Sequence, residues 1–408
     1  MASTFRRTDA TLLVSNGYAE DLIGARLARE LARAGRGPVL ALPLVGPGAA
    51  YAGTAELQGP HLALPSGGFP FGSLANLRAD VQAGLLTVSL RQWAAARRLG
   101  GQVARVVVVG DTYALAVGTL AARVVARPAG RAAGPRLPLT HLQPLVSSFY
   151  AQGMTPAAHL RELNALGANL FMPWEVALAR RARRVYTRDQ PSAVHLARRG
   201  VNAAYRGGFA MDVLPEPERD LGPLLDGRLV LALLPGQRGD AAFSLPVMLE
   251  AAAQLPAWQA AVAFARPFAE LPPLPGWTAG QVDEATLWLR RGETRVLVLR
   301  GAFSAVLHRA ALALGTAGTA NEQAAGLGVP VVGFPTPGPQ YVAGFAARQT
   351  RLLGQALTVT APTAQAVAAA VQSLGTDLTR FQAAQADGRA RIGRPGALTA
   401  VAAELDEN

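Results

Sequence analysis

Apolar runs alternate with helical patterns from the start of the chain. The runs at 11–17, 38–45 and 105–111 are rich in leucine and valine, and each leads into a polar or glycine turn. Such unbroken runs are typical of strands buried on both faces of a parallel sheet. Residues 20–35 place leucine and isoleucine at helical spacing with arginine on the opposite side, and Gly35 ends the pattern. This stretch is therefore predicted to be an amphipathic helix.

The same alternation continues and restarts in the second half. Further strands, with helices between them, are expected at 183–189, 203–212, 228–240, 259–265, 295–301, 310–315 and 329–335. Repeated β–α units predict parallel sheets with helices on both faces.

We therefore expect an α/β protein with two doubly wound, Rossmann-like domains. The predicted boundaries are 1–214 for the N-terminal domain and 226–385 for the C-terminal domain. A Pro- and Glu-bearing link, Pro215–Leu225, joins them. A C-terminal helix at 386–408 could pack back on the first domain.

Missing residue types and motifs limit the chemistry. The chain has no cysteine and no lysine, which excludes disulfides, thiolate ligands, Schiff bases and a P-loop lysine. The histidines are isolated and no HExxH or DxD motif occurs, so we expect no metal site and no obligatory cofactor. There is no signal-peptide pattern and no apolar stretch near the roughly 20 residues that span a bilayer. We expect a cytoplasmic protein.

Charge is unevenly distributed. Up to Asp212 there are 24 arginines against 11 acidic residues, and after it 15 against 16. A GC-rich gene would explain arginine in place of lysine, but not this asymmetry. A basic first half predicts an anionic partner, such as a phospholipid surface, a phosphorylated acceptor or nucleic acid. Aromatic residues are few and no nucleic-acid-binding module is recognised, which disfavours nucleic acid.

Gly315–Gly328 is the most informative stretch. A short strand ends at Gly315 and a helix is expected to begin near Ala320; the small loop residues between them are Thr316, Ala317, Gly318 and Thr319. Small side chains let a phosphate approach backbone N–H groups, and a helix N-terminus adds about half a positive charge. The stretch predicts a diphosphate site, to which the threonine hydroxyls could also donate hydrogen bonds.

Glu322 is expected in the first turn of that helix. A carboxylate there could accept both hydroxyls of a ribose. The same spacing fits a capping box, with Thr319 as the N-cap and Glu322 three residues later. The two interpretations are compatible, and the sequence leaves both open.

A second loop points to the same ligand. LLPGQRGD at 233–240 ends a strand in a Pro–Gly turn and presents Gln237 and Arg238. A guanidinium at this place could neutralise a leaving diphosphate. The alternative is an ordinary surface arginine.

Acidic residues follow two predicted strands of the first domain. Asp111 comes after VVVVG, at the carboxyl end of a buried strand, where open α/β sheets place ligands. It is the first candidate for a catalytic base, and N-cap of the following helix is its structural alternative. Glu20 and Asp21, after the Asn16–Gly17 turn, are the other candidates.

These motifs resemble those of a glycosyltransferase family. LLPGQRGD resembles the LPGSR element of lipid-A-disaccharide synthase, and GTAGTANEQAAGLGVPVV resembles its SGTATLE element and the matching region of MurG-type transferases. The opening SNGYAED, the MPWE run at 172–175 and the segment 338–354 resemble the lipid-A-disaccharide-synthase-related proteins of cyanobacteria and deinococci. The resemblance implies a GT-B fold, in which two Rossmann-like domains face a cleft. The donor nucleotide would lie in the C-terminal domain and the acceptor in the cleft.

The resemblance also implies residue roles. Glu322 would hold the donor ribose, and Arg238 would help Thr316, Gly318 and Thr319 to hold the diphosphate. The backbone of Gly301, Ala302 and Phe303 would meet the uracil, and Gln340 would reach the sugar hydroxyls. Asp111 matches an important aspartate of lipid-A-disaccharide synthase.

The implied activity is inverting transfer of a hexose, for example N-acetylglucosamine, from a UDP-sugar to a lipid-linked or glycolipid acceptor. The related group has NGHGED where this chain has Asn16-Gly17-Tyr18-Ala19-Glu20-Asp21. A lost catalytic histidine would make the chain an altered or inactive nucleotide-sugar-binding protein. A UDP-sugar 2-epimerase of the same fold is the other alternative, although the sequence shows few acids and histidines for it.

The acceptor side is expected around Asn16 and Gly17 and in a Gly- and Phe-rich loop that contains Ser66, Gly67, Gly68 and Phe69. Two patches combine aromatic residues with arginine. Trp93 lies among Arg91, Arg97 and Arg98, and Phe171, Met172 and Trp174 precede a run of arginines. Such patches suit a lipid headgroup interface, although Trp93 could instead be a core residue. We expect a peripheral contact with an anionic membrane, at its inner face.

Overall fold

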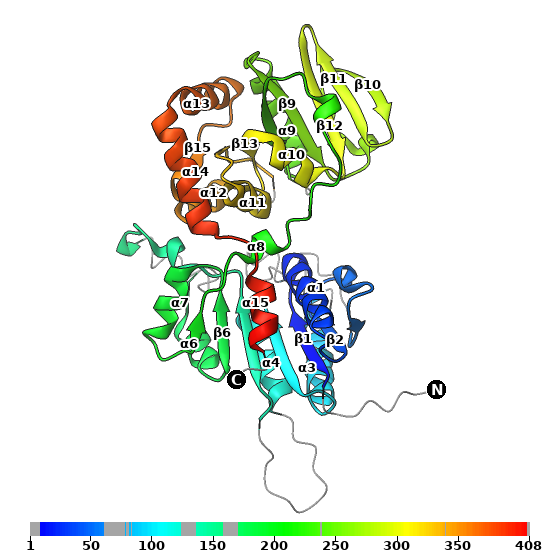
Figure 1. Cartoon of the computed structure of the whole chain (residues 1–408), viewed down its shortest axis with the longest axis vertical. Coiled ribbons are helices and arrows are strands. Elements are labelled where there is room, and N and C mark those ends of the chain that lie inside the picture. The colour runs from blue at the N-terminus through cyan, green and yellow to red at the C-terminus, as the bar shows by residue number, and fades with distance from the viewer. Residues whose placement is uncertain are drawn as a thin grey trace, which may run out of the picture. The chain divides into compact units, whose positions relative to one another are not determined.

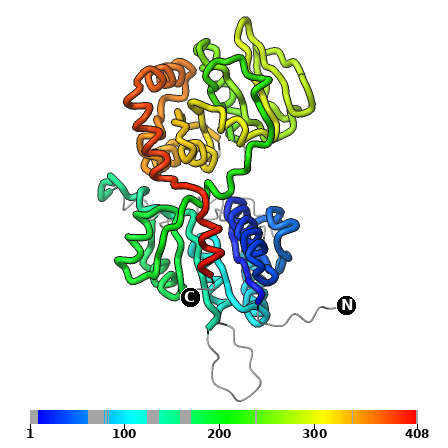
Figure 2. The backbone as a smooth tube through the Cα atoms, viewed as in Figure 1, coloured from blue at the N-terminus to red at the C-terminus, as the bar shows by residue number. Residues whose placement is uncertain are grey.

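The structure, a computed structural model, describes residues 9–60, 78, 81–82, 84–123, 136–157, 170–236, 239–338 and 340–405. The chain divides into two compact units. The first comprises Met1–Val213 and Pro395–Asn408, and the second comprises Leu214–Arg394. The trace in Figure 2 leaves the first unit after residue 213 and returns to it near the C-terminus. The predicted link Pro215–Leu225 belongs to the second unit.

The first unit contains a seven-stranded sheet in the order β3-β2-β1-β4-β5-β6-β7, and all its pairs are parallel. Its strands are β1 (Thr11–Ser15), β2 (Val39–Pro43), β3 (Glu56–Leu57), β4 (Arg105–Val109), β5 (Leu139–Gln143), β6 (Arg184–Thr187) and β7 (Ala203–Ala204). Its helices are α1 (Tyr18–Arg33), α3 (Leu85–Gly100), α4 (Thr112–Ala122), α6 (Pro173–Ala179), α7 (Gln190–Ala197), α8 (Phe209–Asp212) and α15 (Ala397–Glu404).

Alternate residues of each central strand face opposite cores. Val106 and Val108 of β4 pack with α3, α4 and α6, whereas Val107 and Val109 pack with α1 and α15. An apolar run is therefore required on both faces, as the sequence pattern predicts. Within the described ranges, no helix is long and apolar enough to cross a membrane.

The C-terminal segment is not one helix, so the prediction of a single element at 386–408 is wrong. Helix α14 (Leu378–Ile392) belongs to the second unit and α15 to the first. Gly393 and Gly396 both have positive φ and break the helix between them, because glycine adopts that conformation without strain. The Asp212 carboxylate accepts hydrogen bonds from the N–H groups of Gly396 and Leu398, at 2.5 and 2.7 Å, and so starts α15 beside α1 (Figure 1).

The second unit contains an eight-stranded sheet in the order β10-β11-β12-β9-β8-β13-β14-β15. Its strands are β8 (Leu229–Leu234), β9 (Trp258–Phe264), β10 (Thr278–Asp283), β11 (Thr286–Arg291), β12 (Thr294–Arg300), β13 (Ala310–Gly315), β14 (Val331–Gly333) and β15 (Leu357–Val359). Its helices are α9 (Ala241–Ala252), α10 (Phe303–Arg309), α11 (Gly318–Leu327), α12 (Ala343–Leu353), α13 (Ala364–Thr376) and α14.

This sheet departs from the expected β–α alternation at one place. The connection from β9 to β12 contains the antiparallel strands β10 and β11, where a helix was expected. Two-residue links join these strands to one another and to β12. Cation–π contacts hold this extension, with the Arg295 guanidinium 4.5 Å from the centre of the Trp288 ring and Arg291 4.9 Å from that of Trp277.

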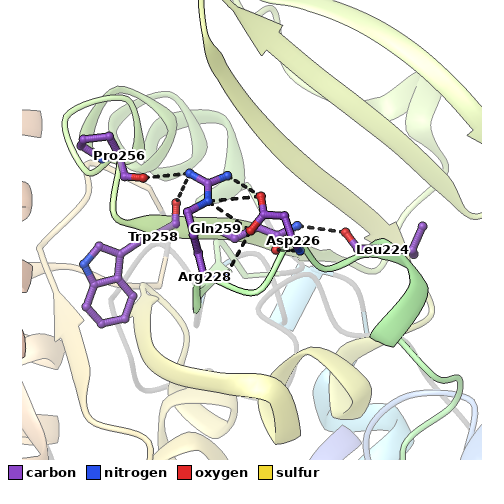
Figure 3. A network of polar contacts seen from close by, with 6 residues as sticks. All are labelled: Leu224, Asp226, Arg228, Pro256, Trp258 and Gln259. Atoms are coloured by element: carbon purple, nitrogen blue, oxygen red, sulfur yellow. Dashed lines mark hydrogen bonds and ion pairs between the residues drawn. The ribbon is translucent and has the colours of Figure 1, made fainter.

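A polar network fixes the point where the second sheet begins. Arg228 forms an ion pair with Asp226 and donates to the carbonyl oxygens of Pro256 and Trp258, while Gln259 donates to that of Leu224 (Figure 3). These bonds join the end of the link to the starts of β8 and β9. The opposite, carboxyl ends of the strands carry the loops described next.

Candidate functional site

The strand order of the first sheet reverses between β1 and β4, and we call the sheet edge at the carboxyl ends of these strands the first crevice. Loops after such neighbouring parallel strands diverge and leave room for a ligand. Here the loop after β1 carries Asn16 and Gly17, and the loop after β4 carries Gly110 and Asp111. Sequence-predicted residues of the acceptor and base sites therefore lie at one edge of one sheet.

Asp111 is the N-cap of α4. Its Oδ1 accepts hydrogen bonds from the N–H groups of Tyr113 at 2.9 Å and Ala114 at 3.1 Å, so the N-cap alternative is confirmed. Both capping bonds go to one carboxylate oxygen. Burial raises the pKa of Asp111, although its hydrogen bonds, including one to Asn16, lower it.

Glu20 lies close enough to Asp111 for the two charges to interact. Burial raises the Glu20 pKa to about 7, and the negative charges of Asp111 and Asp21 raise it further, against the opposite effect of its own backbone N–H. A Cβ atom on Gly17 would lie 2.2 Å from the Glu20 carboxylate. Glycine at this position allows that close approach.

Asp21 lies beneath the loop and serves as an anchor. The Ser15 hydroxyl donates to Asp21 at 2.6 Å, and the fully buried Tyr51 hydroxyl donates to Ser15 at 2.8 Å. Burial raises the Asp21 pKa to about 6. Of the predicted acidic pair, Glu20 is the one that interacts directly with Asp111.

A fourth carboxyl group joins this cluster and was not among the predicted site residues. Glu175 lies in the first turn of α6, buried, and accepts a 2.5 Å hydrogen bond from Gln143 at the end of β5. Burial raises its pKa to about 7, and the charge of Asp111 contributes to the rise. The sequence signal was an acid in the MPWE run, two residues after the proline that begins a helix.

His141 on β5 supports the loop that carries Asp111. Its Nε2 lies 2.9 Å from the carbonyl oxygen of Gly110, and burial lowers its pKa to about 4. The ring is therefore neutral near pH 7, and Nε2–H donates to the carbonyl. Together these groups form an acid–base cluster that can hold or accept a proton near neutral pH. Its members are Glu20, Asp21, Asp111, His141 and Glu175.

The second unit has its own reversal of strand order, between β8 and β13. The Thr316 N–H donates to the carbonyl oxygen of Leu234 at 3.1 Å, so the loops that follow these two strands lie against each other. These are the loops at 235–240 and 316–317 that the sequence analysis assigned to the diphosphate. The structure therefore places the first residues of the two loops side by side, with Gly236 next to the Thr316 carbonyl oxygen.

Helix α11 begins two residues earlier than predicted. Its first residue is Gly318, its N-cap is Ala317, and no side chain of the N-cap residue caps it. Thr319 is therefore inside the helix, the capping-box interpretation is wrong, and Glu322 lies in the second turn rather than the first. A neighbouring helix also contacts this first turn, since Gln349 of α12 donates to the carbonyl oxygen of Gly318 at 2.8 Å.

The residues in this loop and at the start of α11 differ in their exposure to solvent. Thr319 is exposed and Ala317, Gly318 and Glu322 are half-buried. The Thr316 side chain is buried, and neighbouring atoms enclose its hydroxyl oxygen. Backbone N–H groups at the start of α11, rather than the Thr316 hydroxyl, are therefore suited to meet an anion.

The remaining predicted positions are more scattered. Gly301 is exposed with φ of +64° after β12, and Phe303 begins α10, whose Ser304 and Ala305 N–H groups donate to Glu218. Gln340 is exposed in the loop after β14. Gln237, Arg238 and the loop residues Ser66, Gly67, Gly68 and Phe69 lie outside the described residues. Among the described residues, no group of three or more His, Asp or Glu could hold a metal ion.

Comparison with known proteins finds solved structures that are similar to this chain. No protein-family model matches the chain, and no curated protein matches it in sequence. The rhamnosyltransferase SpnG, complexed with thymidine diphosphate, is 17% identical with a TM-score of 0.60, and 98% of this chain and 100% of SpnG are covered. MurG of Acinetobacter baumannii is 15% identical, with a TM-score of 0.52 and coverage of 98% and 100%.

An epimerase is similar to the same extent. The UDP-GlcNAc 2-epimerase of Neisseria meningitidis, bound to UDP-GlcNAc, is 13% identical, with a TM-score of 0.54 and coverage of 98% and 100%. Such likeness establishes architecture and leaves activity open. Two doubly wound units that match glycosyltransferases over nearly their whole length give this chain the GT-B fold.

Proposed function

We propose that this protein is an inverting glycosyltransferase that moves a hexose, for example N-acetylglucosamine, from a UDP-sugar to a lipid-linked or glycolipid acceptor. One observation carries the proposal. Equivalent crevices hold buried carboxyl groups in the first unit and a helix N-terminus behind small residues in the second. The first suits proton removal and the second suits an anion.

The second unit would bind the donor. The first N–H groups of α11, with Arg238, would stabilise the charge that develops on the leaving diphosphate. Glu322 would accept hydrogen bonds from the ribose hydroxyls, Gln340 would contact the sugar, and the backbone of Gly301 to Phe303 would meet the uracil. SpnG is complexed with thymidine diphosphate and the Neisseria epimerase with UDP-GlcNAc, so the choice of uridine is itself part of the proposal.

The first unit would supply the base. The Asp111 carboxylate takes the proton of the acceptor hydroxyl as the acceptor oxygen bonds to the anomeric carbon, and the bond from this carbon to the diphosphate oxygen breaks. Burial favours protonation of Asp111 once the proton arrives. The raised pKa values of Glu20 and Glu175 allow either to hold a proton next to it.

A lipid-linked acceptor is supported by the outer face of α3. Leu86, Leu90 and Trp93 follow one another at helical spacing and are 65%, 62% and 43% exposed. We call these three residues the α3 stripe. Trp93 is therefore not a core residue. Large apolar side chains that share an exposed helix face are typical of an interaction surface.

Charge around the α3 stripe favours an anionic surface. Arg91, Arg97 and Arg98 are exposed on the same helix, which contains no acidic residue. Because α3 leads into the start of β4, its first turns lie toward the edge that holds Asp111. Trp174, 50% exposed, lies on α6 of the same helical layer, whereas Met172 is buried and Phe171 stacks on His195. Partial insertion in a headgroup layer would bring the acid–base cluster near lipid acceptors.

The test is an assay of the purified protein with UDP-sugars, with and without a membrane lipid extract. Transfer predicts that UDP is released when lipid is added and that the lipid gains the sugar. Thymidine diphosphate sugars are included because SpnG binds that nucleotide. Release of UDP to water at the same rate with and without lipid contradicts the lipid acceptor.

A UDP-sugar epimerase is a second candidate, and the carboxyl cluster favours it more than the sequence did. Epimerisation requires groups that remove a proton from carbon and return it, and Glu20, Asp111 and Glu175 together offer such groups. Formation of an epimer without lipid would support this activity. Tight UDP binding without turnover would instead support a binding protein altered at Tyr18–Ala19.

A further inference from the structure

Asp240 is at the N-cap position of α9, yet its side chain does not cap that helix. The buried carboxylate reaches the loop after β14 instead. It accepts hydrogen bonds from the Thr336 hydroxyl at 2.7 Å, from the Tyr341 N–H at 3.0 Å and from the Gln340 N–H at 3.2 Å. The loop that carries Gln340 is therefore fixed to the loop that ends at Asp240, after β8.

Gln349 of α12 makes an equivalent connection to the loop after β13. Its Nε2 donates to the carbonyl oxygen of Gly318 at 2.8 Å, in the first turn of α11. Its Oε1 accepts from the Tyr341 hydroxyl at 2.8 Å and from Asn321 Nδ2 at 2.9 Å. Asn321 also donates to the carbonyl oxygen of Gly315 at 3.2 Å, at the end of β13.

Tyr341 belongs to both sets of bonds. Its backbone is bonded to Asp240 and its hydroxyl to Gln349, and its side chain is fully buried. A Cβ atom on Gly333 would lie 2.9 Å from this hydroxyl, so the packing leaves no room for the ring to shift. We call Asp240, Asn321, Tyr341 and Gln349 the brace.

The brace connects loops that follow three adjacent strands, β8, β13 and β14. In the proposed function, the first two loops bind the diphosphate and the third binds the sugar. Buried hydrogen bonds of this kind hold loops in one arrangement, because a broken bond leaves polar atoms without water. Contacts with the sugar would then favour the arrangement of α11 that binds the diphosphate. Contacts with the diphosphate would in turn favour the arrangement of the Gln340 loop that binds the sugar.

We propose that Tyr341 is a positioning residue that couples recognition of the hexose to recognition of the diphosphate. It touches neither part of the donor. It makes the affinity for the whole nucleotide-sugar exceed that for the nucleotide alone. The proposal rests on the proposed function and names how the donor site of the second unit selects a sugar-bearing ligand.

The experiment compares the Kd of UDP with the Kd of UDP-N-acetylglucosamine and UDP-glucose, by calorimetry, in the full chain. Tyr341→Phe keeps the ring and the backbone bond to Asp240 but removes the hydroxyl. We expect it to lower the preference for the nucleotide-sugar over UDP by about three- to tenfold, the size of one lost hydrogen bond. Gln349→Leu should act similarly, and the double variant should add little, because both remove the same link.

Thr350→Val is the matched control, since Thr350 lies on the same helix and bonds within it to Ala346. It should leave the preference unchanged. A folded Tyr341→Phe that keeps the wild-type preference overturns the proposal, as does an equal loss for UDP and the nucleotide-sugars. A wild-type protein that binds no nucleotide contradicts the proposed function itself, and the coupling with it.

Discussion

The two crevices of this protein have the same topological origin and opposite chemistry. In the first unit, the buried Glu20 and Glu175 carboxyl groups, from α1 and α6, approach Asp111 at the end of β4. In the second, the loops after β8 and β13 bring together small residues, backbone N–H groups and the N-terminus of α11. A doubly wound sheet therefore fixes where a ligand binds, whereas the few residues after each strand fix what is bound.

The first crevice gathers carboxyl groups whose pKa values burial raises, because burial disfavours ionised carboxylates. The second attracts anions through the dipole of a helix. A reaction that takes a proton from one substrate and releases a diphosphate from the other needs both. The following variants test this division.

The largest effect is expected for Asp111→Asn. Asparagine still caps α4 but cannot accept a proton, so turnover should fall by about 10²–10⁴-fold, the usual contribution of a general base. Steady-state rates and UDP affinity measure the two crevices separately, and UDP affinity should be unchanged. Retained turnover would transfer the role to Glu20 or Glu175.

The second effect concerns the other crevice. Glu322→Ala should weaken UDP binding by roughly 1.5–3 kcal/mol, because a charged hydrogen bond to the ribose is lost. Calorimetry with UDP measures the change, and Glu293→Ala, at an exposed acid between β11 and β12, is the control. Equal UDP affinity in folded Glu322→Ala and the control would remove Glu322 from the site.

The third effect is a dependence of folding stability on pH, which arises from Glu175 of the first unit. The pKa of Glu175 is about 7 in the folded chain against an ordinary value of 4.5, so the folded state holds a proton across that range and loses stability as the pH rises through 7. Glu175→Gln cannot ionise and should raise the free energy of unfolding at pH 8 by roughly 1–3 kcal/mol, with little change at pH 4. Denaturant unfolding at both pH values measures this. An equal shift at pH 4 and pH 8 would mean that packing, not ionisation, is responsible.

The smallest effect is expected at the surface. Leu90→Ser should reduce binding to vesicles that contain phosphatidylglycerol by about threefold or more, since one large apolar side chain leaves the α3 stripe. Leu378→Ser, at a leucine that is 67% exposed in the second unit, is the matched control. A similar loss in both variants would show that no particular face meets the lipid. Salt should weaken binding of the wild-type protein through its arginines.

The regular part of the fold was predictable because its pattern is local. The unbroken run of β4 and the amphipathic residues of α1 follow from strand and helix periodicity. The hairpin of β10 and β11 was missed because every residue of β10 is exposed, so no apolar alternation marks it. The single C-terminal helix was wrong because two glycines break it and Asp212, almost 200 residues earlier in the chain, starts the next helix.

The site was predictable to a similar degree. Asp111 and the loop at Thr316 follow strands, so their place at the sheet edge could be inferred. Glu175 could not be grouped with Asp111, because it comes from α6 and reaches the cluster through packing. The capping box at Thr319 failed because α11 begins at Gly318, which places Thr319 inside the helix.

Helix α15 makes the first unit discontinuous in the chain, and this affects how the protein is made. Leu398 and Val401 fill a core that α1 begins to build and that β4 extends almost 300 residues before them in the chain. On the ribosome, the second unit can complete its sheet while the first still exposes that apolar surface. The domain that is translated first is therefore the last to mature, and its unfinished face is a natural substrate for chaperones during synthesis.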